Sequence, residues 1–153
     1  MDFAYLTGQR VGDLLDVRFE DLHDDGIFVS INKSGNRVKI RIGWNDDLRS
    51  VVHRLRCRAE RYGTVDYLFA GRGEKPLTYF GISCMFRRAA KKAGVEDFHF
   101  HDIRAKALTD LKLAGGDAQG LAGHQSAAMT DHYIKRREIP LVQGVKNLVR
   151  LDA

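Results

Sequence analysis

The stretch from His101 to Tyr133 decides how the second half of the chain folds. It runs through His101-Asp102-Ile103-Arg104, Gly115-Gly116, Asp117 and Ala122-Gly123-His124-Gln125-Ser126 before it reaches Tyr133. Apolar residues recur at helical spacing between these points, a glycine pair is a usual helix end, and Asp and Ser are preferred N-caps. The pattern predicts one helix over 102–113, a short one over 117–122 and another after Ser126.

The side chains in this stretch suit a phosphate ligand. His101 and Arg104 are three positions apart, which places them on neighbouring edges of one helix face. Both belong to the expected first turn, where free N–H groups and the helix dipole favour an anion. A guanidinium binds two phosphate oxygens and an imidazole moves a proton. We therefore expect a phosphodiester target, with Tyr133 as the attacking group.

Composition is compatible with this expectation but does not establish it. The chain has 153 residues, of which 44% are hydrophobic and 29% charged, as in an ordinary single globular domain. Its formal net charge of +5 suits a polyanionic partner. Many basic proteins never contact nucleic acid, so the motifs carry more weight than the charge.

The cysteines and the first residues indicate the cellular compartment of the protein and whether it belongs to a longer chain. Cys57 and Cys84 form no Cys-x-x-Cys pair, so we expect a reducing cytoplasm. The sequence has no apolar run of membrane-spanning length and no secretory signal pattern. Residues 1–8 resemble the tail of a helix that ends at Gly8, so we expect a fragment or one domain of a longer protein.

The first half contains a predicted hairpin. Residues 27–32 and 37–42 alternate apolar and polar side chains, and Lys33-Ser34-Gly35-Asn36 between them is typical of a tight turn. This places Lys33 at the hairpin tip. The outward positions form a basic face of Arg37, Lys39 and Arg41, for which simple solvation and DNA contact are both open interpretations.

Helices account for most of the remaining first part. We expect them over 11–17, 45–62 and from the N-cap Thr78 to Gly94, with a short buried extended segment over 67–70. The predicted buried face of the last of these helices consists of Ile82, Met85, Phe86, Ala89 and Ala93. The fold class is therefore α+β: one mostly helical domain with a small antiparallel sheet.

Arg10 admits two interpretations. Arg10 and Asp13 have helical spacing, so they form either a surface ion pair worth a few tenths of a kcal/mol or a phosphate ligand with its orienting carboxylate. A zinc site of His99 and His101 with His124 or His132 is a weaker alternative, because no Cys lies nearby. The sequence lacks nucleotide-binding loops and a serine-hydrolase elbow, so no cofactor or metal is expected.

Four segments together resemble the catalytic domain of the tyrosine recombinases of the phage integrase type. Thr7-Gly8-Gln9-Arg10, with an acidic residue three positions later, resembles the first-arginine box, and Lys33 with Ser-Gly-Asn resembles the hairpin lysine. His101-Asp102-Ile103-Arg104 matches the His-x-x-Arg box. Gly123-His124, followed nine residues later by Tyr133, matches the Gly-His and nucleophile box. One departure is Ala105-Lys106, where many members carry another His or Arg.

The resemblance implies a site-specific recombinase that needs neither metal nor ATP. In such enzymes the tyrosine, here Tyr133, forms a 3′-phosphotyrosyl link to DNA. His101 would accept its proton, Arg10 and Arg104 would stabilise the phosphorane, and His124 would hydrogen-bond a non-bridging oxygen. Lys33 would protonate the departing 5′-oxygen. Lys39 is a rival for that role, whereas Tyr5 lies too early in the chain to replace Tyr133.

The resemblance also implies partners and a wider context. It predicts double-stranded DNA attachment sites as substrate, a homo-tetramer on DNA, and a C-terminal tail, residues 140–153, exchanged between subunits. It implies an origin in a phage or prophage, and an N-terminal core-binding domain that residues 1–153 lack. Two alternatives remain at this stage: a type IB topoisomerase, which would relax any plasmid, and a DNA-binding regulator with an inactive site.

Overall fold

The computed structural model describes residues 1–131 except 34–35, 64–65, 72–74, 125 and 127. Tyr133, His132 and the tail at 140–153 lie outside the described residues, as does the side chain of Lys33. Across the described part the chain is mostly helical with one small antiparallel sheet, which confirms the predicted fold class. None of the described helices is long and apolar enough to cross a membrane.

Two short helices open the chain. α1 (Asp2–Thr7) ends at Gly8, whose φ of 60° lies in the left-handed region that glycine adopts without strain, as predicted. α2 (Val11–Leu15) stops two residues before its predicted end. Val17 is nevertheless buried, because the chain continues along the core after the helix ends.

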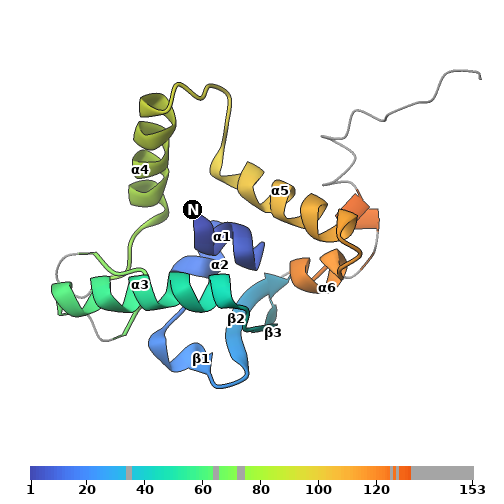
Figure 1. Ribbon diagram of the computed structural model, residues 1–153, viewed down its shortest axis with the longest axis horizontal. Helices are drawn as coiled ribbons and strands as arrows, with labels where there is room; N and C mark the ends of the chain where they lie inside the picture. Colours follow the sequence, from blue (N-terminus) through green and yellow to red (C-terminus); the bar gives the residue numbers. More distant parts are fainter. Residues whose placement is uncertain (34–35, 64–65, 72–74, 125, 127, 132–153) are drawn as a thin grey trace, which may run out of the picture.

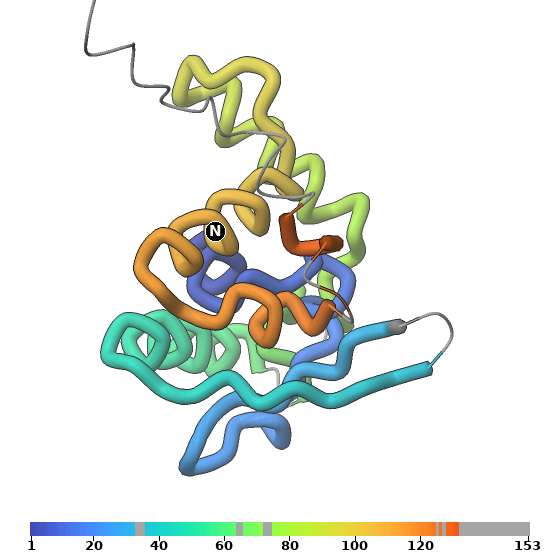
Figure 2. The backbone as a smooth tube through the Cα atoms, turned by 90° about the vertical axis from the view of Figure 1, so that its right-hand side faces the viewer, coloured from blue at the N-terminus to red at the C-terminus, as the bar shows by residue number. Residues whose placement is uncertain are grey.

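The predicted hairpin forms the larger part of the sheet. β2 (Gly26–Lys33) pairs with β3 (Asn36–Gly43), and a two-residue strand, β1 (Leu22–His23), pairs with the other edge of β2. Alternate β2 side chains, Ile27, Val29 and Ile31, are fully buried. Figure 2 shows the hairpin projecting from the helical body, so residues 33 and 36 lie at its outer end.

α3 (Asp46–Tyr62) carries much of the core. The Asn45 side chain accepts the Leu48 N–H, and Gly63 ends the helix in the left-handed region, as the capping pattern predicts. Leu48, Val51 and Val52 are buried against the sheet and α1. Helical spacing predicts that Tyr62 lies on the same apolar stripe as these residues. That prediction is wrong, because the last turn of α3 extends beyond the core and leaves Tyr62 exposed.

α4 (Tyr79–Lys92) differs from its prediction. Thr78 caps it as expected, but of its predicted buried face only Phe86 is buried, and Met85, Ala89 and Ala93 are exposed. Figure 1 shows the reason: α4 stands away from the body, and its main helix contact is with α2. Phe86 packs on Phe98 and Phe100 in the chain that leads back from α4.

The region from α5 onward returns to the body. α5 (Phe100–Leu113) packs on α1, which in turn contacts α3. α6 (Ala118–Ala122) is capped by the Asp117 side chain and packs on α5. Residues 128–131 are again helical, as predicted after Ser126, and the Met129 N–H bonds to the Ser126 carbonyl.

Candidate active site

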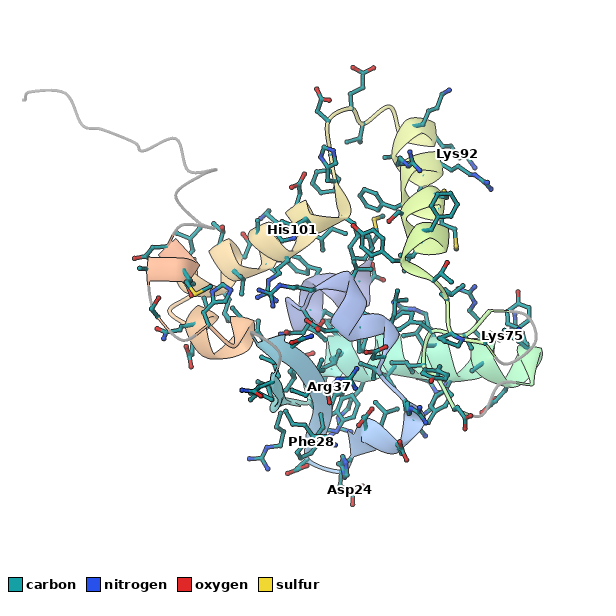
Figure 3. The ribbon with its side chains drawn as sticks, turned by 180° about the vertical axis from the view of Figure 1, so that it is seen from behind. Asp24, Phe28, Arg37, Lys75, Lys92 and His101 are labelled. Atoms are coloured by element: carbon teal, nitrogen blue, oxygen red, sulfur yellow. The ribbon has the colours of Figure 1, made fainter. Side chains whose placement is uncertain are left out.

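A cleft of about 940 Å³ brings three of the predicted site residues together. Arg10, His101 and Arg104 all line it. One wall comes from the segment that begins α2 and from the start of α5, and the other from α4 and the connection after it. This second wall consists of Tyr79, Ser83, Phe86, Arg87 and Phe98. Figure 3 labels His101 on the part of α5 nearer to α4.

Arg104 is buried rather than poised on the helix surface. α5 begins at Phe100, two residues earlier than predicted, so Arg104 belongs to its second turn and is only 2% exposed. Its Nη1 donates to the Gly8 carbonyl at 2.6 Å and its Nη2 to the Ala122 carbonyl at 2.9 Å. Both side chains line the cleft, as their spacing predicts, but His101 is exposed whereas Arg104 is buried.

His124 is fixed beside Arg104. Its Nε2 lies 3.2 Å from Arg104 Nη2, and its Nδ1 lies 2.9 Å from the Thr130 hydroxyl. A guanidinium can only donate, so Nε2 accepts and Nδ1 carries the proton that bonds to Thr130. The Gly-His pair has a steric basis: Gly123 has a φ of 62°, and a Cβ there would collide with the Ile31 side chain of β2.

The environment of Arg10 is the opposite of that of the buried, hydrogen-bonded Arg104. It is half-buried in the cleft wall and, among the described residues, makes no hydrogen bond or ion pair. The predicted Arg10–Asp13 surface pair does not form at contact distance. Arg10 acts on Asp13 through its field instead, where its charge tends to lower the pKa of that carboxyl. An unengaged guanidinium in a cleft suits an incoming anion.

Asp13 lies near enough to both arginines for their charges to act on its carboxyl. Burial raises the pKa of its carboxyl, an effect opposed by a backbone N–H from Asn32 and by the charges of Arg10 and Arg104. Asn32 immediately precedes Lys33 on β2, so Asp13 links α2 to the strand that carries the hairpin lysine. One carboxylate oxygen of Asp13 is buried and has no hydrogen-bond partner in the described part of the chain.

His101 is exposed on the first turn of α5 and faces the cleft. The helix start is fixed by Asp102, whose carboxylate accepts the His99 N–H at 2.8 Å. In the described residues no three His, Cys, Asp or Glu side chains gather at metal-binding distance. His99 lies beside Asp102, and His124 bonds to Arg104 and Thr130.

The tyrosine that rivals Tyr133 is engaged elsewhere. The Tyr5 hydroxyl donates to Asp110 at 2.6 Å, and Lys106 binds the same carboxylate. The hydrogen bond to Asp110, together with burial, raises the pKa of Tyr5, which disfavours a phenolate nucleophile. The catalytic roles of all six predicted residues remain predictions, and the structure does not describe the side chains of Tyr133 and Lys33.

Sequence reasoning gave no role to two residues that shape this site. Gln9 is 1% exposed, and its Nε2 donates to the Thr7 carbonyl at 2.9 Å and the Leu121 carbonyl at 2.5 Å. Thr130 fixes the His124 ring through its hydroxyl. Gln9 has a sequence signal, because it lies inside the first-arginine box, whereas Thr130 has none beyond its place after His124.

Comparison with known proteins agrees with the fold and the boxes. Residues 1–138 match the phage integrase family. The chain is 29% identical over 147 residues to the integrase of Enterobacteria phage P21, covering 87% of this chain and 38% of the relative. It therefore spans about two fifths of the length of that curated relative.

Solved structures of the integrase of phage lambda are similar over most of the chain. The catalytic core has a TM-score of 0.65 at 28% identity, covering 80% of this chain and 79% of that one. The lambda integrase tetramer bound to a Holliday junction has a TM-score of 0.69 at 28% identity, covering 86% and 40%. The matched residues contain the first-arginine, His-x-x-Arg and Gly-His boxes in their expected order, and the chain belongs to the phage integrase family.

Proposed function

We propose that this chain is the catalytic part of a tyrosine-type site-specific DNA recombinase that joins itself to DNA through Tyr133. The observation that carries the proposal is the single cleft lined by Arg10, His101 and Arg104, with His124 bonded to Arg104. Family membership adds the expected reaction class. The cleft wall and the bonded histidine are built from three separate segments of the chain.

The chemistry is a transesterification that conserves the phosphodiester bond. The Tyr133 hydroxyl attacks the phosphorus while His101 takes its proton, which an unperturbed phenol with a pKa of about 10 requires. The bond from phosphorus to the 5′-oxygen breaks, and Lys33 protonates that oxygen. The product is a 3′-phosphotyrosyl ester and a free 5′-hydroxyl. Attack by a 5′-hydroxyl of another strand reverses each transfer and releases Tyr133.

The two arginines stabilise the charge that develops on the phosphorane. Arg104 is preorganised by its carbonyl bonds, and Arg10 is open to the phosphate. Preorganised donors of this kind contribute about 10²–10³ in rate each. His124 accepts from Arg104 in the structure, so a hydrogen bond from its Nε2 to a phosphate oxygen requires that ring nitrogen to gain a proton as DNA binds.

The proposed substrate is double-stranded DNA carrying specific attachment sites, and the proposed assembly is a tetramer. The net charge of +5 and the exposed basic residues of β3 and α4 favour a polyanion. The related lambda integrase was solved as a tetramer on a Holliday junction. We extend that arrangement to this protein, with an origin in a phage or prophage.

Covalent trapping on a mixture of DNA sequences tests the proposal. The protein is incubated, in EDTA, with a pool of duplexes that carry a nick beside a randomised segment, and covalent adducts are isolated and sequenced. We expect an adduct enriched in one sequence that Tyr133→Phe abolishes and Tyr5→Phe, the matched control, preserves. Adducts without sequence enrichment would indicate a topoisomerase, and absence of any adduct would contradict the proposal.

The tail at 140–153 is proposed to pass to a neighbouring subunit. Truncation after Ile139 should then leave the unfolding temperature nearly unchanged while it reduces the fraction of DNA held in paired complexes. Native gel electrophoresis with the selected DNA measures both singly and multiply bound species. Unaltered pairing by the truncated chain would show that the tail serves its own domain.

A further inference from the structure

Gln9 and Arg104 make parallel bonds across the same interface. Gln9 Nε2 donates to the Thr7 and Leu121 carbonyls, and Arg104 donates to the next carbonyls in each segment, those of Gly8 and Ala122. Two adjacent carbonyls at the end of α1 are thus tied to two adjacent carbonyls at the end of α6. We call these four hydrogen bonds the double bridge.

The double bridge connects the two ends of the candidate site. Gly8 and Gln9 lead directly into Arg10, and Ala122 is separated from His124 by Gly123 alone. The bridged glycine is also constrained: Gly8 has a φ of 60°, and a Cβ there would press on the Leu121 side chain at 3.0 Å. The Gly8 backbone therefore packs directly against the Leu121 side chain. The Gln9 and Arg104 side chains, which connect the two segments, fix the separation of Arg10 from His124.

Burial makes the Gln9 bonds consequential. Gln9 is 1% exposed and its bond to the Thr7 carbonyl is buried, so loss of its amide donor would leave that carbonyl without this partner, at a cost larger than the bond itself is worth. Gln9 also lines the cleft next to Arg10. Only the two Arg104 bonds of the double bridge, to the Gly8 and Ala122 carbonyls, would then remain.

We propose that Gln9 is a positioning residue for the strand-transfer reaction, acting through the double bridge on Arg10 and on the Arg104–His124 pair. The inference rests on the proposed function for its kinetic part and on geometry alone for its structural part. Gln9 acts through its amide group, so a side chain of the same length without that group should lose the effect.

Gln9→Met tests the kinetic part. With a nicked duplex selected by covalent trapping, we expect the first-order cleavage rate at saturating DNA to fall about 10-fold to 100-fold, as small misplacements of catalytic groups do, while DNA affinity stays within about 2-fold. Active-site titration separates a lower rate from a smaller folded fraction. Gln119→Met is the matched control, since the Gln119 amide makes one long bond in the described structure, to the His124 carbonyl at 3.4 Å.

The His124 ring tests the structural part whether or not the protein cleaves DNA. Nitrogen NMR of the unaltered protein should show one neutral tautomer protonated at Nδ1, and Gln9→Met should show a mixture of tautomers, with Gln119→Met unchanged. Ring signals in Gln9→Met identical to those of the unaltered protein overturn the proposal, as does an equal change in Gln119→Met. If Gln9→Met fails to fold, Gln9→Asn, one methylene too short to span both carbonyls, replaces it.

If the unaltered protein gives no adduct, the proposed function fails, and the NMR result alone decides the role of Gln9. If adducts form but the Gln9→Met rate equals that of the unaltered protein, the positioning role fails and the proposed function stands. The two failures are therefore distinguishable.

Discussion

The two walls of the cleft are built in different ways. The wall that holds Arg104, to which His124 is bonded, is joined by buried hydrogen bonds between three segments, and the Arg104 side chain is almost fully enclosed. The helix α4, which carries most of the other wall, presents large apolar side chains to its surroundings, with Phe80 74% and Tyr79 63% exposed. Only Phe86 anchors it in a buried aromatic contact within the described chain.

The two walls therefore differ in how they hold their side chains: one fixes them before a ligand binds, and the other leaves them accessible. A buried arginine bound to carbonyls loses little freedom when a phosphate arrives, which is the condition for strong transition-state stabilisation. Arg10, at the junction of the walls, keeps its guanidinium unengaged among the described residues. The candidate site thus contains one arginine held by hydrogen bonds and one arginine without a bonded partner in the described part of the chain.

The largest effect is expected from Arg104→Met. It removes donors from the Gly8 and Ala122 carbonyls and from His124 Nε2, so the free energy of unfolding should fall by about 3–5 kcal/mol and adduct formation should be lost. Urea unfolding measures the first and covalent trapping the second. Lys106→Met removes the same charge from the exposed side of α5 and should stay close to the unaltered chain. A stable Arg104→Met variant would show that the joined wall does not depend on this side chain.

Arg10→Met should separate activity from stability. Because Arg10 has no bonded partner in the described structure, the free energy of unfolding should change by less than about 0.5 kcal/mol. The cleavage rate should fall about 10²–10³-fold, as for loss of one charge-stabilising donor. A variant that unfolds more easily, or that cleaves at the original rate, would contradict the contrast between the two arginines.

Asp13→Asn probes the carboxylate on which the charges of both arginines act. The folded-state pKa of Asp13 is raised by burial, so its contribution to stability is greatest below the unfolded pKa of about 3.9 and declines as pH rises through the folded value. The Asn variant lacks that decline. Its stability relative to the unaltered chain should therefore improve between pH 4 and pH 7, by no more than about 1 kcal/mol. Urea unfolding at both pH values measures this, and a relative loss on raising the pH would contradict it.

The smallest effect is expected on the exposed face of α4. Phe80→Ser should change the free energy of unfolding by less than about 0.5 kcal/mol, since its ring is already exposed. Phe86→Ala, on the same helix, should cost about 3 kcal/mol or more. Thermal unfolding of the two variants side by side gives the comparison. A large loss in Phe80→Ser would mean that its ring is covered in solution.

Local signals predicted the helices and the hairpin well. Asn45, Thr78 and Asp117 cap as expected because a cap bonds to residues two or three positions away. The exposure of α4 was missed, since helical periodicity identifies the apolar face but not whether another element covers it. The two-residue strand β1 is too short to leave an alternating pattern.

At the candidate site, too, local sequence signals identified residues but not their tertiary contacts. The boxes identified Arg10, His101, Arg104 and His124, three of which line the cleft while His124 bonds to Arg104. The burial of Arg104 was not predictable, because its partners Gly8 and Ala122 come from segments distant in sequence. Spacing within one helix placed it beside His101, and tertiary contacts turned it inward.

The most direct measurement is a crystal structure of the protein with its selected DNA, cut at the target phosphate, and orthovanadate, which mimics a pentavalent phosphorane. We predict vanadium bonded to the Tyr133 hydroxyl oxygen at one apex and the 5′-oxygen at the other, with the Arg10 guanidinium on an equatorial oxygen. Water or another side chain at the apex, or Arg10 turned away from the vanadate, would contradict the proposed site.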